Sequence, residues 1–147
     1  MKSPREWIWL AVSIQVVGLT FDALWHGLHP GFEATTVAEM ATHLGTVHLP
    51  IYVGVLAVLA STTWALIDRA RRGRAGIALP LAFAGALVAA TGEAWHAYMH
   101  LQLSTHGGPI AAGTAALGLL VVIVAVWRSG RGARRRAAAD IDRRRAA

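Results

Sequence analysis

Two short stretches of this sequence combine carboxylates and imidazoles at helical spacing. Residues 21–29 read FDALWHGLH and residues 93–100 read EAWHAYMH. Each contains a carboxylate, a histidine one turn later and a second histidine about two turns later: Asp22, His26 and His29, and Glu93, His96 and His100. At about 100° per residue, each trio lies within a helical sector of roughly 60°. Neutral imidazole and carboxylate are ligands for zinc, copper(II) and non-haem iron, so each stripe is a candidate half of a metal site.

The remaining histidines enlarge this candidate site. The chain contains seven histidines, and no lysine or arginine lies among them in residues 22–48 or 93–106. We predict that the metal ligands are Asp22, His26, His29, His43, His48, Glu93, His96 and His100, with Glu39 and His106 in a supporting shell or at the mouth. The expected core of this set is Asp22, His26, Glu93, His96 and His100. One ion needs three or four protein ligands, so one ion with a generous outer shell and a cluster of two ions both remain open.

Four apolar stretches must position these residues: 7–28, 47–67, 77–100 and 110–127. Each is about as long as the roughly 20 residues that a helix needs to cross a hydrocarbon core of about 30 Å. None has the polar stripe of a soluble bundle. We therefore predict an all-α integral membrane protein, with residues 1–127 forming one bundle of four transmembrane helices. The first stretch offers no convincing signal cleavage site, so we expect it to remain in the mature protein.

The basic residues predict an orientation. All fourteen lysines and arginines precede residue 7, lie between residues 69 and 74, or follow residue 127. By the positive-inside rule both termini face the cytoplasm, and the histidine-bearing connections face the extracytoplasmic side of the cell membrane. At about 1.5 Å per residue, Asp22 lies roughly 25 Å and His26 roughly 31 Å from Arg5, which places both near the outer edge of the hydrocarbon.

A short helix is expected in the first outer connection. In TTVAEMATHLG, Thr36 is the predicted N-cap, Glu39 completes a capping box and Gly45 ends the helix. Glu39 and His43 share a face of this surface helix because they are four residues apart. For Glu39, a capping role and a metal or hydrogen-bonding role remain equally open.

The rest of the composition narrows the possible partners. The chain has no cysteine, which excludes disulfides and thiolate metal sites. We expect the Arg/Ala-rich residues 128–147 to form a disordered cytoplasmic tail that contacts anionic lipids of the bilayer. No aromatic platform or reading motif accompanies these arginines, so no nucleic acid partner is expected. Small residues along 77–100 and 110–127 predict close packing of these two spans, and a homo-oligomer or a partner membrane subunit is compatible with the small outer surface.

One family resemblance rests on Asp22-x-x-x-His26 near the outer end of a span, followed by a histidine at the start of the next span. This pattern resembles the intramembrane copper site in the C subunit of the copper membrane monooxygenases that act on methane and ammonia. The resemblance implies an extracytoplasmic Asp/His/His metal site in which Asp22 and His26 are the matching positions. It covers about thirty residues. The chain is much shorter than those subunits and spaces its third histidine differently.

Three functions remain open from the sequence. The first is a metalloenzyme or redox subunit that uses copper, iron or zinc as a Lewis acid or to activate oxygen. The second is a membrane protein that captures, senses or transfers copper or zinc. The third is an electron carrier in which two histidines, such as His26 and His96, bind haem. A transporter is disfavoured because the deeper half of the spans lacks ionisable residues, and a metal-free pH sensor is also compatible with so many imidazoles.

Overall fold

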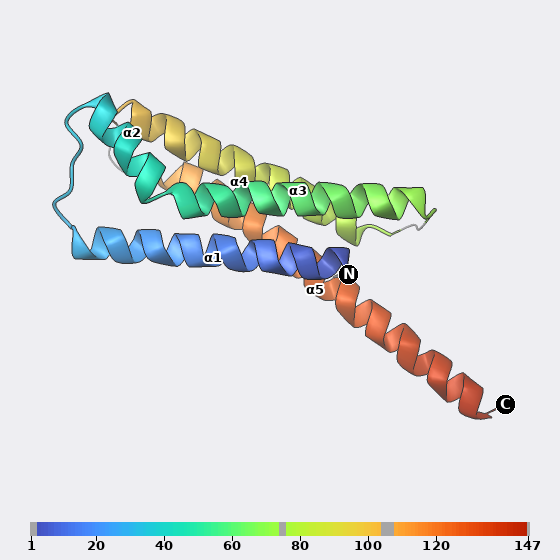
Figure 1. The fold of residues 1–147 in the computed structure, drawn as a ribbon. Coiled ribbons are helices and arrows are strands. Elements are labelled where there is room, and N and C mark those ends of the chain that lie inside the picture. Colours follow the sequence, from blue (N-terminus) through green and yellow to red (C-terminus); the bar gives the residue numbers. More distant parts are fainter. Residues whose placement is uncertain (1–2, 74–75, 104–107, 147) are drawn as a thin grey trace.

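The computed structural model describes residues 3–73, 76–103 and 108–146, and every regular element within these ranges is a helix. The helices are α1 (Pro4–Leu28), α2 (Val37–Thr46), α3 (Leu49–Arg71), α4 (Ala78–Leu101) and α5 (Gly108–Ala146) (Figure 1). Four segments are long and apolar enough to cross a membrane: Pro4–Leu28, Leu49–Arg71, Ala78–Leu101 and Pro109–Arg131. The predicted four-helix membrane bundle and the short helix after the first span are both confirmed.

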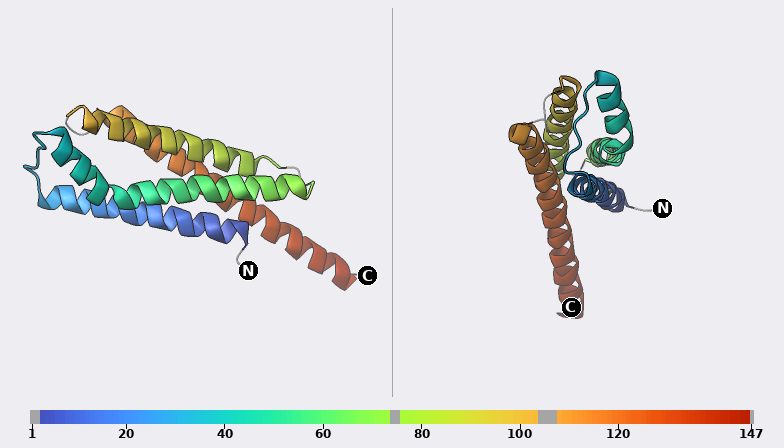
Figure 2. Two further views of the ribbon diagram at one scale, coloured as in Figure 1. Left: turned by 45° about the horizontal axis from the view of Figure 1, so that its top comes forward. Right: turned by 90° about the vertical axis from the view of Figure 1, so that its left-hand side faces the viewer.

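The bundle consists of two closely packed helix pairs. α1 packs along α3 and α4 packs along α5, while α3 and α4 join the pairs and α1 contacts α5 only weakly (Figures 1 and 2). In the second pair, a Cβ atom on Gly92 would collide with the backbone of Ala115, and one on Gly118 would collide with the backbone of Ala89. Only glycine permits this approach, so the predicted close packing of these two spans is confirmed.

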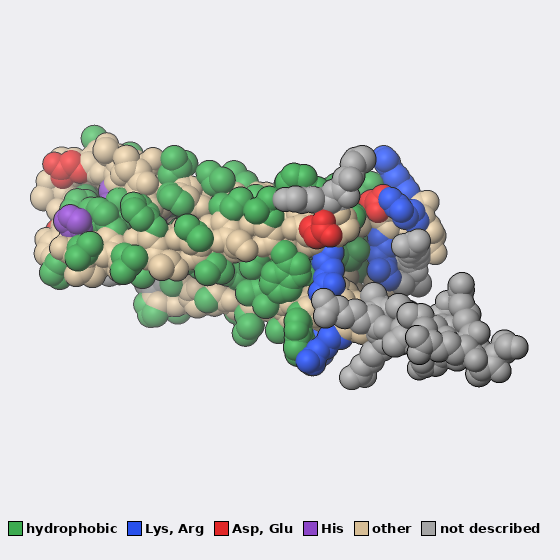
Figure 3. Space-filling model, turned by 60° about the horizontal axis from the view of Figure 1, so that its bottom comes forward, with side chains coloured by type: hydrophobic (Ala, Val, Ile, Leu, Met, Phe, Trp, Pro, Cys, Tyr) green, Lys and Arg blue, Asp and Glu red, His purple; other side chains and the backbone are tan. Residues whose placement is uncertain are grey.

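The two ends of the bundle differ in chemistry. Described arginine side chains gather at one end, which we call the arginine end, and a histidine and an acidic side chain are visible at the opposite, histidine end (Figure 3). The main apolar core, which includes Ile8, Val58 and Val122, lies toward the arginine end. Many large apolar side chains between the two ends face outward, such as Val17 and Leu56. An apolar exterior of this kind matches a lipid environment.

The last helix is longer than the span that the sequence predicts. We expected the span to end near residue 127 and the remaining residues to be disordered, whereas the backbone of α5 stays helical to Ala146. The physical reason is composition, because alanine and arginine are among the best helix-forming residues.

Candidate metal centre

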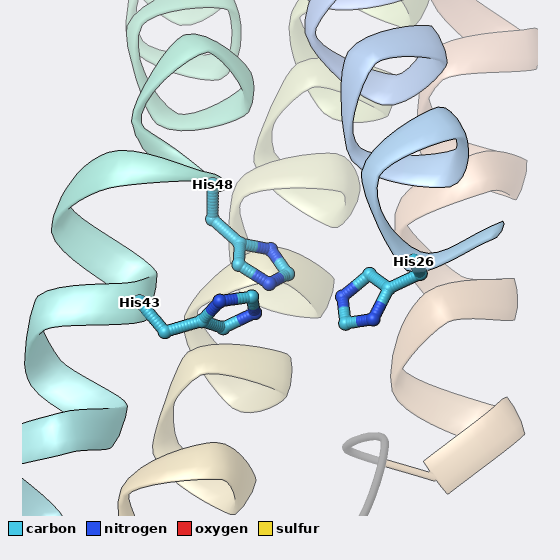
Figure 4. Close-up of side chains that lie close together, drawn as sticks. All are labelled: His26, His43 and His48. Atoms are coloured by element: carbon cyan, nitrogen blue, oxygen red, sulfur yellow. The ribbon is translucent and has the colours of Figure 1, made fainter. Parts of the chain in front are cut away.

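Three histidines from separate parts of the chain meet at the histidine end. His26 comes from the last turn of α1, His43 from α2 and His48 from the N-cap position of α3. Their rings point toward one another (Figure 4), with centroids 5.0 to 5.9 Å apart. One ligand nitrogen from each ring lies within 4.8 Å of the other two. We call this group the three-helix triad.

A second group, which we call the α4 triad, consists of His48, His96 and His100. His96 and His100 lie one turn apart on α4, and their Nε2 atoms are 3.0 Å apart. Two nitrogens bound at about 2.05 Å to one ion would lie roughly 2.9 Å apart at a right angle and roughly 3.3 Å apart in a tetrahedron. The spacing of this pair is therefore already close to that of two ligands on a common metal ion.

His48 belongs to both triads and is the most enclosed of the histidines described, at 1% exposure. Among the described residues, neither of its ring nitrogens has a hydrogen-bond partner. A buried imidazole without hydrogen bonds is costly, because its polar atoms have lost their hydrogen bonds to water. A metal ion, a hydrogen-bonding water molecule or both would satisfy these nitrogens.

The carboxylate of Asp22 on α1 lies close to two of these histidines, His26 of α1 and His48 at the start of α3. Its Oδ1 atom is 3.4 Å from Nε2 of His48 and 3.6 Å from Nε2 of His26, and the carboxylate is partly buried. These distances are longer than good hydrogen bonds. The carboxylate is thus placed to enter a metal's ligand set directly or to orient its imidazoles.

Aromatic side chains hold His43 in place. Its ring lies 4.5 Å from the ring of Phe32 and 4.6 Å from that of Trp25, measured between centroids. Burial, followed by the nearby His26, lowers the pKa of His43 below its ordinary value. The imidazole is consequently neutral at physiological pH, which is the form that binds metal ions.

The centre opens through a small cavity of about 90 Å³ at the histidine end. His26, His43 and His100 line it together with Phe32, Glu33 and Met40. The cavity touches both triads, so a hydrated ion or a small molecule can approach either of them from this side.

Of the predicted residues that the structure describes, Asp22, His29, Glu39 and Glu93 belong to neither triad. His29 is exposed, its Nδ1 atom is 2.8 Å from the carbonyl oxygen of Trp25, and its ring stacks on the Trp25 indole. The helix ends at Leu28, so His29 does not continue the stripe of Asp22 and His26. In this structure His29 belongs to neither triad, and its role as a ligand stays a prediction. His106 lies outside the described residues.

Glu39 anchors the start of α2 and does not reach the triads. Its carboxylate accepts hydrogen bonds from the backbone N–H and the hydroxyl of Thr35, at 2.9 and 3.0 Å. The Thr35 N–H bond is the main reason that the pKa of Glu39 falls below its ordinary value. Thr36 is the N-cap as predicted, and its hydroxyl accepts from the Glu39 N–H at 3.2 Å. Of the two roles left open for Glu39, the structure favours the one at the helix start.

Glu93 also stands apart from the two triads. It is 7% exposed and lines a cavity beside His96 on the side facing the arginine end. The two triads comprise His26, His43, His48, His96 and His100, whereas Glu93 of the expected core lies next to them.

Tyr52 lies beside the candidate metal centre but was not among the residues predicted from the sequence. Its hydroxyl is buried and lacks a hydrogen-bond partner among the described residues, and its ring stacks on that of His48 with centroids 6.2 Å apart. The available signal was the spacing, since Tyr52 follows His48 by four residues and so lies one turn along the same helix face.

Comparison of the chain with protein-family models, curated proteins and solved structures finds no match. The functional assignment therefore depends on the geometry of these residues.

Proposed function

We propose that this chain is a membrane metalloprotein that binds transition-metal ions, copper, iron or zinc, in the two histidine triads. The observation that carries the proposal is His48, which is fully enclosed, lacks hydrogen-bond partners on both ring nitrogens and faces both triads. We assign one ion position to each triad, with His48 bridging them as an imidazolate that has given up its ring N–H proton to solvent and binds one ion through each nitrogen. Imidazole and carboxylate ligands suit all three metals.

A redox or oxygen-activating role is the function that we favour for this centre. Asp22, His26 and His48 lie together, which supports the Asp/His/His set implied by the resemblance to the copper membrane monooxygenase C subunit. A copper or iron ion in such a site supplies one-electron or oxygen chemistry. The chain's own contribution is to hold neutral imidazoles, to place a carboxylate beside them and to leave one open approach.

Metal capture or transfer is the second candidate. The observation that favours it is access: the His26 side chain is 30% exposed and lines the cavity that opens at the histidine end. An ion can reach the ligands there without crossing the bundle. Oxygen-dependent turnover of a substrate by the metal-loaded protein would select the enzyme, and transfer of the ion to a chelating acceptor without turnover would select the carrier.

The geometry does not favour haem. Pockets that enclose ligands of drug size usually measure about 300 to 1,000 Å³. The cavity shared by His26, His43 and His100 measures about 90 Å³, and the one beside His96 about 120 Å³. Both cavities are much smaller than a pocket for a macrocycle, so absence of a Soret band is the expected result.

Metal analysis tests the proposal directly. The full chain, purified in detergent after growth with copper, iron and zinc, is expected to retain up to two ions per chain after mild chelation. His29→Ala is the matched control, because it removes an exposed histidine outside the triads and is expected to keep the wild-type metal content. A wild-type protein that retains no transition metal would overturn the proposal.

The proposed orientation places the centre on the extracytoplasmic side. The absence of cysteine makes this easy to test, since a single introduced thiol is then unique. Thr42→Cys on α2 is expected to react with a membrane-impermeant maleimide in intact cells, and Ala70→Cys near the end of α3 only after permeabilisation. The reverse pattern would invert the topology and leave the metal proposal unaffected.

A further inference from the structure

A second cavity lies beside the metal centre, on the side facing the arginine end. It has a volume of about 120 Å³ and is bounded by all four spanning helices. Gln15, Asp22, Glu93 and His96 supply its polar boundary. The remaining wall is apolar and consists of Leu19, Ile51, Ala112, Ala115 and Ala116.

Gln15 is the feature that points to a ligand. The side chain is 1% exposed and lies in an apolar bundle, yet its Oε1 atom has no hydrogen-bond partner among the described residues. An amide in this position pays the cost of losing water without compensation. Because Gln15 lines the cavity, a molecule within the cavity can supply the missing bond.

The polar boundary favours a ligand that donates hydrogen bonds. Carboxylates accept hydrogen bonds when ionised, and the free atom of Gln15 is an acceptor as well. Oδ1 of Asp22, which also lines the cavity, lacks a hydrogen-bond partner among the described residues. The apolar wall opposite these acceptors suits an aliphatic body.

The cavity also has a route to the lipid. Ala112 and Ala116 of α5 line it together with Gln15 and Leu19 of α1, both alanines are exposed, and α1 and α5 contact each other only weakly. Small side chains at this place leave a gap through which a lipid-soluble molecule can enter. A cavity of about 150 Å³ accommodates benzene, so about 120 Å³ suits a ligand of roughly five or six non-hydrogen atoms.

We propose that this cavity binds a short aliphatic alcohol that enters from the membrane between α1 and α5 and donates its one hydroxyl hydrogen bond to Oε1 of Gln15, beside the carboxyl groups of Asp22 and Glu93. The bound molecule lies next to His96, and therefore beside the metal centre. Binding itself does not require the metal. Any role of the alcohol as a substrate rests on the proposed function.

Photolabelling tests the cavity on the full chain, purified in detergent and treated with chelator. The probe is a three-carbon primary alcohol that carries a diazirine and has six non-hydrogen atoms. Illumination is expected to place the adduct on the cavity wall formed by Leu19, Ile51 and the Ala112 to Ala116 turn. Excess 1-butanol should suppress the adduct more strongly than excess n-pentane.

Three variants make the test specific. Ala116→Leu fills the entrance and is expected to reduce labelling of the cavity wall to the level found on lipid-facing residues. Ala84→Leu is the matched control, since Ala84 is an exposed alanine of α4 away from the cavity, and labelling should stay at the wild-type level. Gln15→Leu preserves the apolar volume and should weaken competition by 1-butanol about five- to tenfold, the effect of one hydrogen bond of about 1 to 1.4 kcal/mol.

Labelling that is spread over the apolar exterior, or that persists in Ala116→Leu, would overturn the proposal, as would a wild-type protein with no adduct in the cavity. The last result is also the one expected if only water fills the cavity. Failure of the metal proposal is recognised separately, by the metal content of the protein before chelation.

Discussion

The two triads share His48 but are built in different ways. The α4 triad takes two ligands from one helix, and the spacing of His96 and His100 places them together as soon as α4 forms. The three-helix triad takes His26, His43 and His48 from α1, α2 and the start of α3, so it requires α2 to fold back over the end of the bundle. The α4 triad thus obtains two of its three ligands from local structure, whereas the three-helix triad depends on tertiary structure for all of them. We expect the α4 triad to be the more robust of the two.

The largest effect is expected from His48→Ala, because this change removes a ligand from both triads at once. The prediction is loss of nearly all bound metal, measured as ions per chain by mass spectrometry on the purified protein. Circular dichroism in the same sample checks that the helices remain. Full retention of metal by a folded His48→Ala protein would show that the two triads do not share this residue.

Changes confined to one triad should remove one ion and leave the other. His100→Ala affects the α4 triad alone and His43→Ala affects the three-helix triad alone, so each is expected to halve the metal content. The copper(II) EPR spectra of the two variants should differ, since a different ligand set survives in each. Identical spectra from both variants would argue for a single ion bound by all the histidines.

Asp22→Asn should weaken binding without abolishing it. The amide preserves the shape of the side chain but removes the negative charge beside His26 and His48. Loss of a carboxylate that orients metal ligands typically lowers metal affinity about 10- to 100-fold. Competition with a chelator of known affinity measures the change, and an unaltered affinity would remove Asp22 from the centre.

A smaller effect is expected from Glu39→Ala, which removes the two hydrogen bonds to Thr35 at the start of α2. The loosened helix should bind metal less well in the three-helix triad and equally well in the α4 triad. Because the pKa of Glu39 is lowered in the folded protein, its carboxylate stabilises α2 above the ordinary pKa and loses this effect as the pH falls through the lowered value. Hydrogen exchange of the α2 amides measures the loosening of the helix, and metal analysis measures binding. Equal loss of metal from both triads would contradict this prediction.

The smallest effect is expected from His29→Ala. Its ring stacks on Trp25 and contacts a backbone carbonyl outside both triads. Metal content and affinity should match the wild type within error. A marked loss of metal would mean that His29 joins the centre in the metal-bound state.

The sequence predicts the part of this centre that local structure builds better than the part that depends on tertiary structure. Helical spacing indicated that Asp22 and His26 share a face, as do His96 and His100, and the apolar stretches predicted the four spans. Spacing along one helix does not show where a connection folds, so the importance of His43 and His48 was underestimated. The expected stripe of Asp22, His26 and His29 extends past Leu28, where α1 ends, so helical spacing does not place His29 in this structure. The amide oxygen of Gln15, which has no hydrogen-bond partner among the described residues, is likewise visible only once the four helices are packed together.

X-ray absorption at the metal edge of the fully loaded protein tests the central claim most directly, because it reports the ligands of the bound ion. For two histidine triads we predict about two ions per chain, each with imidazole scattering and metal–nitrogen distances of roughly 2.0 to 2.1 Å. A first shell made only of oxygen, without the imidazole signature, would contradict the assignment of the triads as the metal centre.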